Sequence, residues 1–213
     1  MICISLGNMS FKECKELVRK EEFVELRLDL LKLAPIQVKE LVELPGKKII
    51  TCRQGDYTDN ERLELFSKAI ASGVDYLDLE LEMPDEMRQT IITRARSSDC
   101  QIIISYHDYS GTPARESLQD LIHACKEAGA DIVKLACQVN EPSDNIRLLS
   151  LYDANERLVI IGMGRLGTIT RIAGPLLGGI FTFAAPGQEM ETAAGQLTKE
   201  SLQQVYDLIG ANI

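Results

Sequence analysis

Lys134 is the residue of this chain whose position most clearly points to chemistry, because it lies within an apolar run that is typical of a buried strand. Lysine is rarely buried without a partner. In an apolar pocket an ammonium group loses hydration, which favours the neutral amine, and a neutral amine condenses with ketones and aldehydes to form an imine. A lone strand-end lysine more often has a buried stem and a charged head that reaches water. The hypothesis of imine chemistry therefore depends on the residues around Lys134.

A second group of polar residues lies on two strands that precede Lys134 in the chain. Glu25, Arg27 and Asp29 alternate along one predicted strand, so we expect all three to point to the same side. A carboxylate beside a guanidinium can bind hydroxyls and anionic groups, although a structural ion pair explains this triplet equally well. Arg53 ends the next predicted strand. These residues are candidates for binding a polar substrate.

A general acid or base is also available. His107 is one of only two histidines and ends the predicted strand before the one that carries Lys134, whereas His123 lies inside a predicted helix and is expected at the surface. Arg171 follows a glycine-rich segment, 162–167, that could cradle a phosphate, but the pattern is weak. Together these residues indicate an imine on Lys134 of a hydroxylated keto acid. The iminium would draw electrons as an adjacent C–H proton leaves, His107 would move that proton, and arginines would hold the carboxylate.

The elements that position these residues alternate between short apolar runs and longer amphipathic ones. We predict strands at residues 2–6, 23–28, 48–52, 76–80, 102–106, 132–135, 158–162 and 179–183, and helices that include 60–72, 85–97, 115–128, 142–152, 168–177 and 199–209. Eight strand-then-helix units predict a (β/α)8 TIM barrel that forms one domain over residues 1–213. An open doubly wound sheet is the alternative, but no GxGxxG motif follows the first strand.

Composition narrows the possible partners. The chain has 213 residues, 45% of them hydrophobic, and a net charge of -9, which disfavours nucleic acid and anionic membranes as partners. No basic leader or apolar run of transmembrane length is present, so we expect a cytoplasmic protein. The six cysteines occur singly, without CxxC pairs or histidines at metal-ligand spacing, and are expected to be reduced core thiols. We expect no metal site.

The ordered series of motifs resembles the type I 3-dehydroquinate dehydratases. The segments that carry the resemblance are Glu25-Leu26-Arg27-Leu28-Asp29, Thr51-Cys52-Arg53, Asp78-Leu79-Glu80, Ser105-Tyr106-His107-Asp108, the run ending in Lys134, Gly167-Thr168-Ile169-Thr170-Arg171, Thr182-Phe183 and Thr192-Ala193-Ala194-Gly195-Gln196. The resemblance implies a barrel enzyme that dehydrates 3-dehydroquinate to 3-dehydroshikimate through an imine, without metal or organic cofactor, and a homodimer.

The resemblance also assigns roles by position. It implies that Lys134 forms the imine and that His107 is the general base and acid. By the same resemblance, residues that bind the substrate are Arg171, Gln196 and Thr192 near its carboxylate, and Glu25, Arg27 and Arg53 near its hydroxyls.

Departures from the family pattern occur in two loops. The family usually has a glutamate a few residues after the third-strand arginine, where it orients the histidine, but the segment after Arg53 is shorter and lacks it. Asp56 or another carboxylate could substitute. Gln188 lies in a segment similar to the family's substrate loop, but Gln196 has the better spacing from Thr182-Phe183.

Two other functions remain open. A class I aldolase on a barrel also uses a lysine imine, and it would be favoured by a phosphate site in the glycine-rich segment. A non-catalytic binding module is the other alternative, motivated by the absent glutamate. Product analysis separates the three, because only the dehydratase yields a conjugated enone acid from a single substrate.

Overall fold

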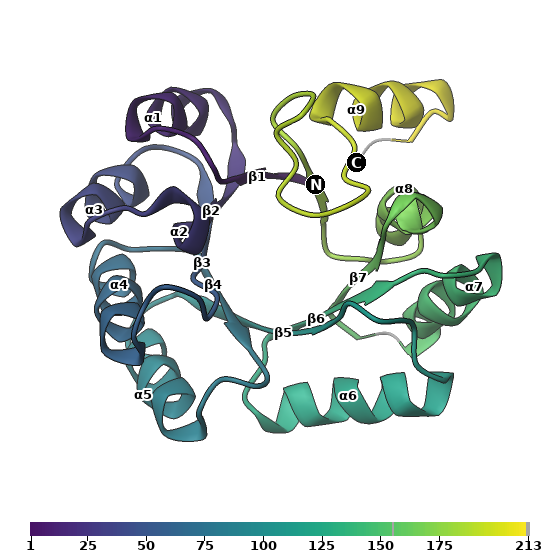
Figure 1. The fold of residues 1–213 in the computed structure, drawn as a ribbon, viewed down its shortest axis with the longest axis horizontal. Helices are drawn as coiled ribbons and strands as arrows, with labels where there is room; N and C mark the ends of the chain where they lie inside the picture. The colour runs from purple at the N-terminus through teal and green to yellow at the C-terminus, as the bar shows by residue number, and fades with distance from the viewer. Residues whose placement is uncertain (155, 212–213) are drawn as a thin grey trace.

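Parallel strands wind around a common axis and helices surround them in the computed structural model, which describes residues 1–154 and 156–211 (Figure 1). The strands are β1 (Ile2–Leu6), β2 (Phe23–Arg27), β3 (Lys47–Thr51), β4 (Tyr76–Glu80), β5 (Gln101–Asp108), β6 (Ile132–Gln138), β7 (Leu158–Met163) and β8 (Thr182–Ala184). Neighbours pair in the order β7-β6-β5-β4-β3-β2-β1-β8. The predicted (β/α)8 barrel is thus confirmed, and the open doubly wound sheet is excluded.

The barrel has one seam where the strand pairing is incomplete. β1 pairs in parallel with both β2 and β8, which brings the beginning and end of the strand series together. Across the remaining gap, between β7 and β8, the backbone N–H of Ile180 donates a hydrogen bond of 3.0 Å to the carbonyl of Leu158. This bond lies before β8 begins, so the seam is closed near the N-terminal ends of the strands and is bridged elsewhere by loops.

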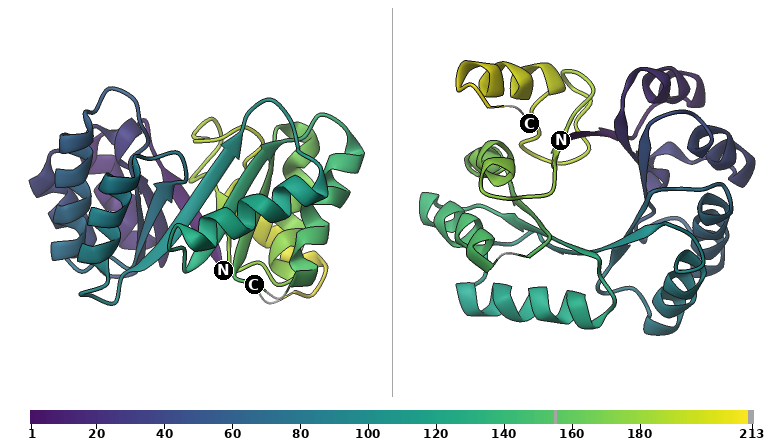
Figure 2. Two further views of the ribbon diagram at one scale, coloured as in Figure 1. Left: turned by 90° about the horizontal axis from the view of Figure 1, so that it is seen from below. Right: turned by 180° about the vertical axis from the view of Figure 1, so that it is seen from behind.

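The outer layer consists of helices that cover the strands on all sides (Figure 2). These are α1 (Phe11–Lys20), α2 (Leu28–Leu31), α3 (Pro35–Val42), α4 (Asp59–Ala71), α5 (Asp85–Ala95), α6 (Arg115–Glu127), α7 (Pro142–Leu149), η1 (Ser150–Ala154), η2 (Arg165–Gly167), α8 (Thr168–Leu176) and α9 (Lys199–Leu208). Ser10, Thr58 and Thr198 cap α1, α4 and α9 by accepting backbone N–H bonds. Within the described residues, no helix is long and apolar enough to cross a membrane.

The two ends of the barrel interior differ in chemistry. Toward the N-terminal ends of the strands it is filled by aromatic rings, with Phe23 and Phe181 packed edge to face at 5.1 Å between centroids. The larger hydrophobic core lies between strands and helices. All six cysteines are buried and unpaired, which confirms the prediction of core thiols. The polar residues are left to the C-terminal ends of the strands.

Several strand boundaries differ from those predicted, and the differences move functional residues. β6 continues to Gln138, so Lys134 lies in the middle of a strand rather than near its end. β5 likewise continues past His107 to Asp108, while β2 ends at Arg27 and Asp29 lies in α2. β8 covers Thr182–Ala184 instead of 179–183. At the end of β5, the polar residues His107 and Asp108 interrupt the apolar pattern, which is why the strand was predicted to end before them.

Candidate active site

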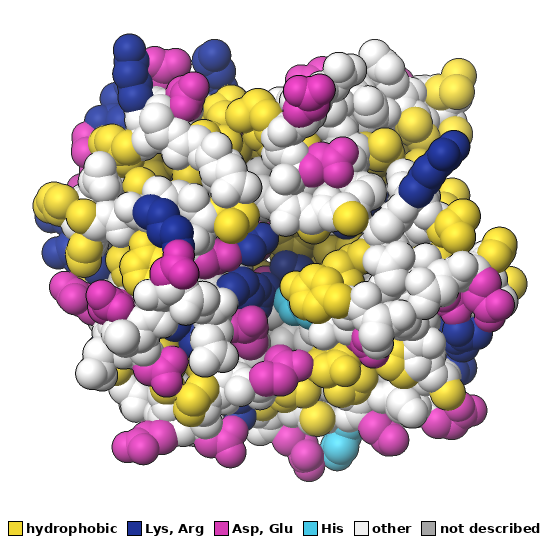
Figure 3. Space-filling model, viewed as in Figure 1, with side chains coloured by type: hydrophobic (Ala, Val, Ile, Leu, Met, Phe, Trp, Pro, Cys, Tyr) yellow, Lys and Arg dark blue, Asp and Glu magenta, His cyan; other side chains and the backbone are white. Residues whose placement is uncertain are grey.

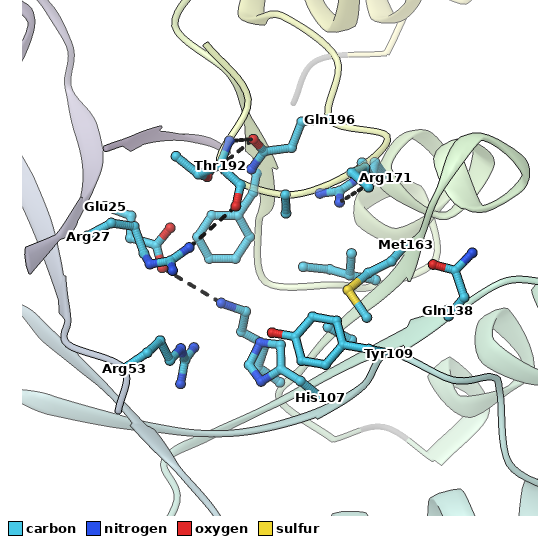
Figure 4. Close-up of a pocket in the computed structure, with 16 residues that line it drawn as sticks. Glu25, Arg27, Arg53, His107, Tyr109, Gln138, Met163, Arg171, Thr192 and Gln196 are labelled. Atoms are coloured by element: carbon cyan, nitrogen blue, oxygen red, sulfur yellow. Dashed lines mark hydrogen bonds and ion pairs between the residues drawn. The ribbon is translucent and has the colours of Figure 1, made fainter. Parts of the chain in front are cut away.

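A pocket opens at the C-terminal ends of the strands, at the hollow in the centre of the face seen in Figure 3. Its lining includes every residue to which the family resemblance assigned a role, and the substrate-binding candidate Asp29 lies outside the lining. The residues with assigned roles are Glu25, Arg27, Arg53, His107, Lys134, Arg171, Thr192 and Gln196. The remaining lining residues are Tyr109, Ala136, Gln138, Ile161, Met163, Phe183, Ala193 and Ala194. Residues far apart in the chain thus share one cavity (Figure 4).

Lys134 is held by charges as well as by apolar groups. Its side chain is 7% exposed, and its Nζ donates a hydrogen bond of 2.8 Å to Asp78 Oδ2 and lies 3.7 Å from Glu25 Oε1. The same atom lies 4.2 Å from the centroid of the Phe183 ring. The apolar pocket expected from the sequence is therefore only part of the environment. Two buried carboxylates compensate the charge of the ammonium group.

Asp78 connects Lys134 to Arg53. Its Oδ1 accepts hydrogen bonds from Ser105 Oγ and, at 2.9 Å, from Arg53 Nη2. Burial alone would raise the pKa of Asp78, but the positive charges of Arg53 and Lys134 outweigh it and hold that pKa well below its usual range. In Arg53 burial is likewise outweighed, and the nearby carboxylates raise the pKa of the guanidinium. Asp78 is therefore an ionised carboxylate between two cations.

Glu25 connects Lys134 to the loop that follows β8. Its carboxylate accepts hydrogen bonds from Ser5 Oγ and, at 2.8 Å, from Thr51 Oγ1. Ser5 Oγ in turn accepts a bond of 2.6 Å from Thr192 Oγ1. A continuous chain of hydrogen bonds thus runs from Thr192 through Ser5 to Glu25, 3.7 Å from the amine of Lys134.

The loop after β8 is ordered by its own side chains and by Arg27. Gln196 Oε1 accepts the backbone N–H of Thr192 at 2.9 Å. Arg27 forms a two-point ion pair with Asp29, at 2.6 and 3.0 Å, and lies 3.5 Å from the carbonyl of Thr192. Gln188 is exposed and does not line the pocket, so the structure brings Gln196, and not Gln188, to the site.

Arg171 is the cation of the pocket whose charge is least compensated. The residue is 1% exposed, its Nη2 lies 3.4 Å from the carbonyl of Ala194, and its Nε has no hydrogen-bond partner among residues 1–154 and 156–211. Burial lowers its pKa to about 10, partly offset by Glu191. A buried guanidinium with free N–H groups that faces a cavity is a binding site for an anion. Figure 4 shows Arg171 across the pocket from Glu25 and Arg27.

His107 is held neutral by its surroundings. Burial, followed by the positive charges of Arg53 and Lys134, lowers its pKa to about 2, against an opposing effect of Asp78. A neutral imidazole can accept a proton at pH 7. Asp56 does not substitute for the absent glutamate, because its side chain is 88% exposed and forms an ion pair with Lys32. His123 lies on the surface as expected, with its side chain 75% exposed.

Comparison with known proteins identifies the family of the chain. The family model described as type I 3-dehydroquinase matches residues 2–213. The chain belongs to the type I 3-dehydroquinase family. A 3-dehydroquinate dehydratase of Desulfotalea psychrophila is 31% identical over 219 residues, covering 96% of each chain. One from Methanococcus maripaludis is 32% identical over 222 residues, covering 99% of this chain and 100% of the relative. A solved 3-dehydroquinate dehydratase from Geobacillus kaustophilus has a TM-score of 0.87 at 25% identity, covering 98% of this chain and 90% of that one.

The glycine-rich segment has a structural role in this member of the 3-dehydroquinase family. The N–H of Gly162 donates to Thr170 Oγ1, that of Gly164 to the carbonyl of Ala194, and that of Gly167 to the carbonyl of Gly164. A Cβ on Gly167 would lie 2.4 Å from the backbone of Gly162. The amides of Gly162 and Gly167 thus hold the turn and the start of α8, and that of Gly164 joins the turn to the loop after β8. The phosphate cradle that would have favoured an aldolase is therefore not supported.

Asp78 and Ser5, which bond to site residues from behind the pocket of this 3-dehydroquinase, and Tyr109, which lines it, were given no site role in the sequence analysis. Asp78 and Ser5 are short polar residues inside otherwise apolar strands, and that position is a signal comparable to the one that singled out Lys134. Tyr109 follows His107 by two residues, so strand alternation could have placed it on the same side. Within the described residues, no group of three or more His, Cys, Asp or Glu side chains is arranged to hold a metal ion.

Proposed function

We propose that this chain eliminates water from 3-dehydroquinate to give 3-dehydroshikimate, through an imine formed on Lys134, as a step of the shikimate pathway. Membership of the type I 3-dehydroquinase family and the names of the full-length relatives support the reaction. The positions of the pocket residues support the assignment of roles.

The observation that carries the proposal is the pairing of the buried amine of Lys134 with the buried, only partly compensated guanidinium of Arg171 across one pocket. The amine of Lys134 can attack a carbonyl carbon. Nε of Arg171 has no hydrogen-bond partner in the described part of the chain, so the guanidinium can bind a carboxylate. A ligand that satisfies both must carry a ketone and a carboxylate on one small frame. 3-Dehydroquinate has both groups and also hydroxyls for Glu25, Arg27 and Arg53.

The reaction can be written as three balanced steps. The ammonium group of Lys134 gives up a proton and the free amine adds to the ketone; the ketone oxygen then leaves as water with two of the three ammonium protons, which forms the protonated imine (iminium). His107 then takes a proton from the carbon next to the imine carbon, the electron pair moves toward the nitrogen, and its return expels the hydroxyl one carbon further on, with a proton supplied by His107. Water finally hydrolyses the imine and releases Lys134. The net change is the loss of one water, and the product is a conjugated enone acid.

The charges around Lys134 favour these reaction steps. A protonated iminium keeps the positive charge that Asp78 and Glu25 compensate in the free protein, at 2.8 and 3.7 Å from Nζ. Those carboxylates therefore stabilise the electron sink. His107 starts neutral, because burial and nearby cations lower its pKa, and its free lone pair can take the proton. The same cations oppose the protonated imidazole, which favours passing the proton on to the leaving hydroxyl.

Further parts of the proposal concern the rest of the protein. Gln196 and Thr192 close the site beside the substrate carboxylate. The barrel acts as one catalytic domain over residues 1–213, works in the cytoplasm as a homodimer, and uses no metal or organic cofactor. The family relationship supports these statements, and sedimentation of the purified protein tests the dimer.

The test is to follow enone absorbance with 3-dehydroquinate, and to add borohydride to a parallel sample for peptide mass mapping. We expect enone formation, a reduced adduct on Lys134, and neither signal in Lys134→Ala. An adduct without enone would instead indicate the non-catalytic binding module. Release of two carbonyl fragments would indicate an aldolase, and dehydration that survives in Lys134→Ala would refute the imine route.

A further inference from the structure

Tyr109 is a large aromatic side chain in an exposed position at the mouth of the pocket. The residue is 75% exposed, yet it lines the same cavity as Lys134 and His107. Its ring lies against the imidazole of His107, with 6.0 Å between centroids and 15° between planes. Figure 4 shows the phenol ring lying over His107 at the side of the pocket. This geometry is within the range of offset-stacked aromatic pairs.

The chain holds Tyr109 in this place through the end of β5. Side chains alternate along a strand, so Ser105 and His107 point to the barrel interior, and Tyr109, the first residue after β5, lies on the same side at the mouth of the pocket. Directly after the strand, Asp108 Oδ1 accepts the backbone N–H groups of Ser110 and Gly111, at 2.9 and 3.1 Å. Such an Asx turn restricts the backbone on the C-terminal side of Tyr109.

A neighbouring loop supports the same turn. Asn140, which follows β6, donates a hydrogen bond of 2.8 Å from Nδ2 to the carbonyl of Ser110. Exposed loop residues without such bonds are generally mobile. The bonds on Asp108 and Ser110 therefore allow an exposed ring to keep a defined orientation toward His107.

His107 has few other groups to orient it. The charged groups that face it are Arg53 after β3, Lys134 on β6, Asp78 on β4 and Arg27 on β2, and they act at a distance through their charge. Within residues 1–154 and 156–211, no group forms a hydrogen bond with its imidazole. The ring plane of His107 is therefore set by what it packs against.

We propose that Tyr109 is the positioning residue of His107, and that its ring holds the imidazole in the orientation needed for proton transfer by parallel stacking. The inference rests on the proposed dehydratase function. An aromatic ring would then orient the histidine in place of the absent glutamate, since Asp56 is exposed and paired with Lys32. The ring, and not the phenol hydroxyl, carries the effect.

Variants at Tyr109 distinguish the effect of the aromatic ring from the effects of side-chain size and of the hydroxyl. Tyr109→Phe keeps the stack and should retain kcat within about twofold, whereas Tyr109→Leu and Tyr109→Ala should each lower kcat by about 3- to 10-fold with little change in KM. Borohydride trapping on Lys134 should persist in all of them, since imine formation precedes the proton transfer. Tyr57→Leu, which removes a half-buried tyrosine outside the pocket, should behave as wild type.

Nuclear magnetic resonance tests the stack without relying on turnover. The chain has only two histidines, so His107→Gln assigns both sets of imidazole signals, and the exposed His123 serves as the internal reference. The ring current of the stacked phenol should displace the His107 signals in wild type and in Tyr109→Phe. In Tyr109→Leu and Tyr109→Ala this displacement should disappear, while the His123 signals stay in place.

The inference and the proposed function fail in different ways. A wild-type protein that forms no enone would refute the dehydratase, whatever the imidazole signals show. If wild type is active, unchanged His107 signals or an unchanged kcat in Tyr109→Leu would overturn the positioning role. A loss in Tyr109→Phe as large as in Tyr109→Ala would also overturn it, because the hydroxyl would then be responsible.

Discussion

Replacing Arg171 by methionine should make the protein more stable and less active at the same time. Methionine keeps most of the length of the side chain and removes the charge. The arginine is 1% exposed, and burial lowers its pKa from its ordinary value to about 10. Since one pKa unit corresponds to about 1.4 kcal/mol, holding the guanidinium charged costs the folded protein about 3 kcal/mol. The weak contact of 3.4 Å with Ala194 returns at most about 1 kcal/mol.

We therefore expect Arg171→Met to raise the free energy of unfolding at pH 7 by about 1 to 3 kcal/mol. The same change removes the proposed partner of the substrate carboxylate. A charged, hydrogen-bonded contact of this kind is worth about 2 to 5 kcal/mol, so kcat/KM should fall by about 30-fold or more. The two effects have opposite signs because the site is built for a ligand.

Urea denaturation of the free protein measures the first effect, and steady-state enone formation measures the second. Arg62→Met is the matched control, because Arg62 is also 1% exposed but is fully partnered. It donates to the carbonyl of Cys52 at 3.0 Å and pairs with Glu80 and Asp59 at 3.0 and 3.3 Å. Leaving these partners unpaired should lower the free energy of unfolding by about 3 to 5 kcal/mol.

The reasoning would be refuted if Arg171→Met were destabilised to the same extent as Arg62→Met. In that case the guanidinium would already be compensated in the free protein. An unchanged kcat/KM in Arg171→Met would refute the second half, because the substrate carboxylate would then bind elsewhere.

Three further predictions concern the centre of the pocket. His107→Gln should retain borohydride trapping on Lys134 but lose about 100- to 10,000-fold in kcat, and enone formation at the wild-type rate would contradict its role. Because the pKa of His107 is lowered to about 2 in the folded protein, unfolding takes up a proton below the unfolded pKa of about 6.5; wild type should therefore lose about 2 kcal/mol more stability than His107→Gln between pH 8 and pH 5, measured by urea denaturation at each pH. Asp78→Asn leaves Lys134 and Arg53 without their shared carboxylate and should lower the free energy of unfolding by about 3 to 5 kcal/mol, whereas an unchanged urea midpoint would show that Glu25 compensates both.

The sequence was sufficient to predict the barrel and the positions of its strands. Alternating apolar and amphipathic runs reflect burial between two layers, a local property that a single chain displays directly. Strand ends were less accurate. β5 continues through His107 and Asp108, whose polar side chains break the apolar pattern, whereas β6 continues through Ala136 and Cys137 to Gln138, where pairing with β7 decides the end of the strand.

The sequence located the pocket residues by their type and their place in the predicted strands. It did not identify their hydrogen-bond and ion-pair partners. Lys134 stood out because its strand is apolar, yet nothing in the sequence states that Asp78, 56 residues earlier, is its hydrogen-bond acceptor. Register between β4, β5 and β6 decides that contact, and register is a property of the folded sheet. That Nε of Arg171 lacks a hydrogen-bond partner among the described residues is similarly visible only when its neighbours are known.

The incomplete seam between β7 and β8 is the place where we expect the barrel to open most readily. Near the N-terminal ends of the strands the seam is joined by the bond from Ile180 to Leu158, and above it the loop of Thr192 and Gly195 rests on Gly164. Regions held by few backbone bonds are the first to exchange their amide hydrogens with solvent. We therefore expect amides around β8 to exchange faster than those of β4 and β5. A ligand held by both Lys134 and Arg171 would connect β6 to α8 beside this seam. Bound substrate should therefore slow amide exchange there, because it completes the connection that the strand pairing leaves open.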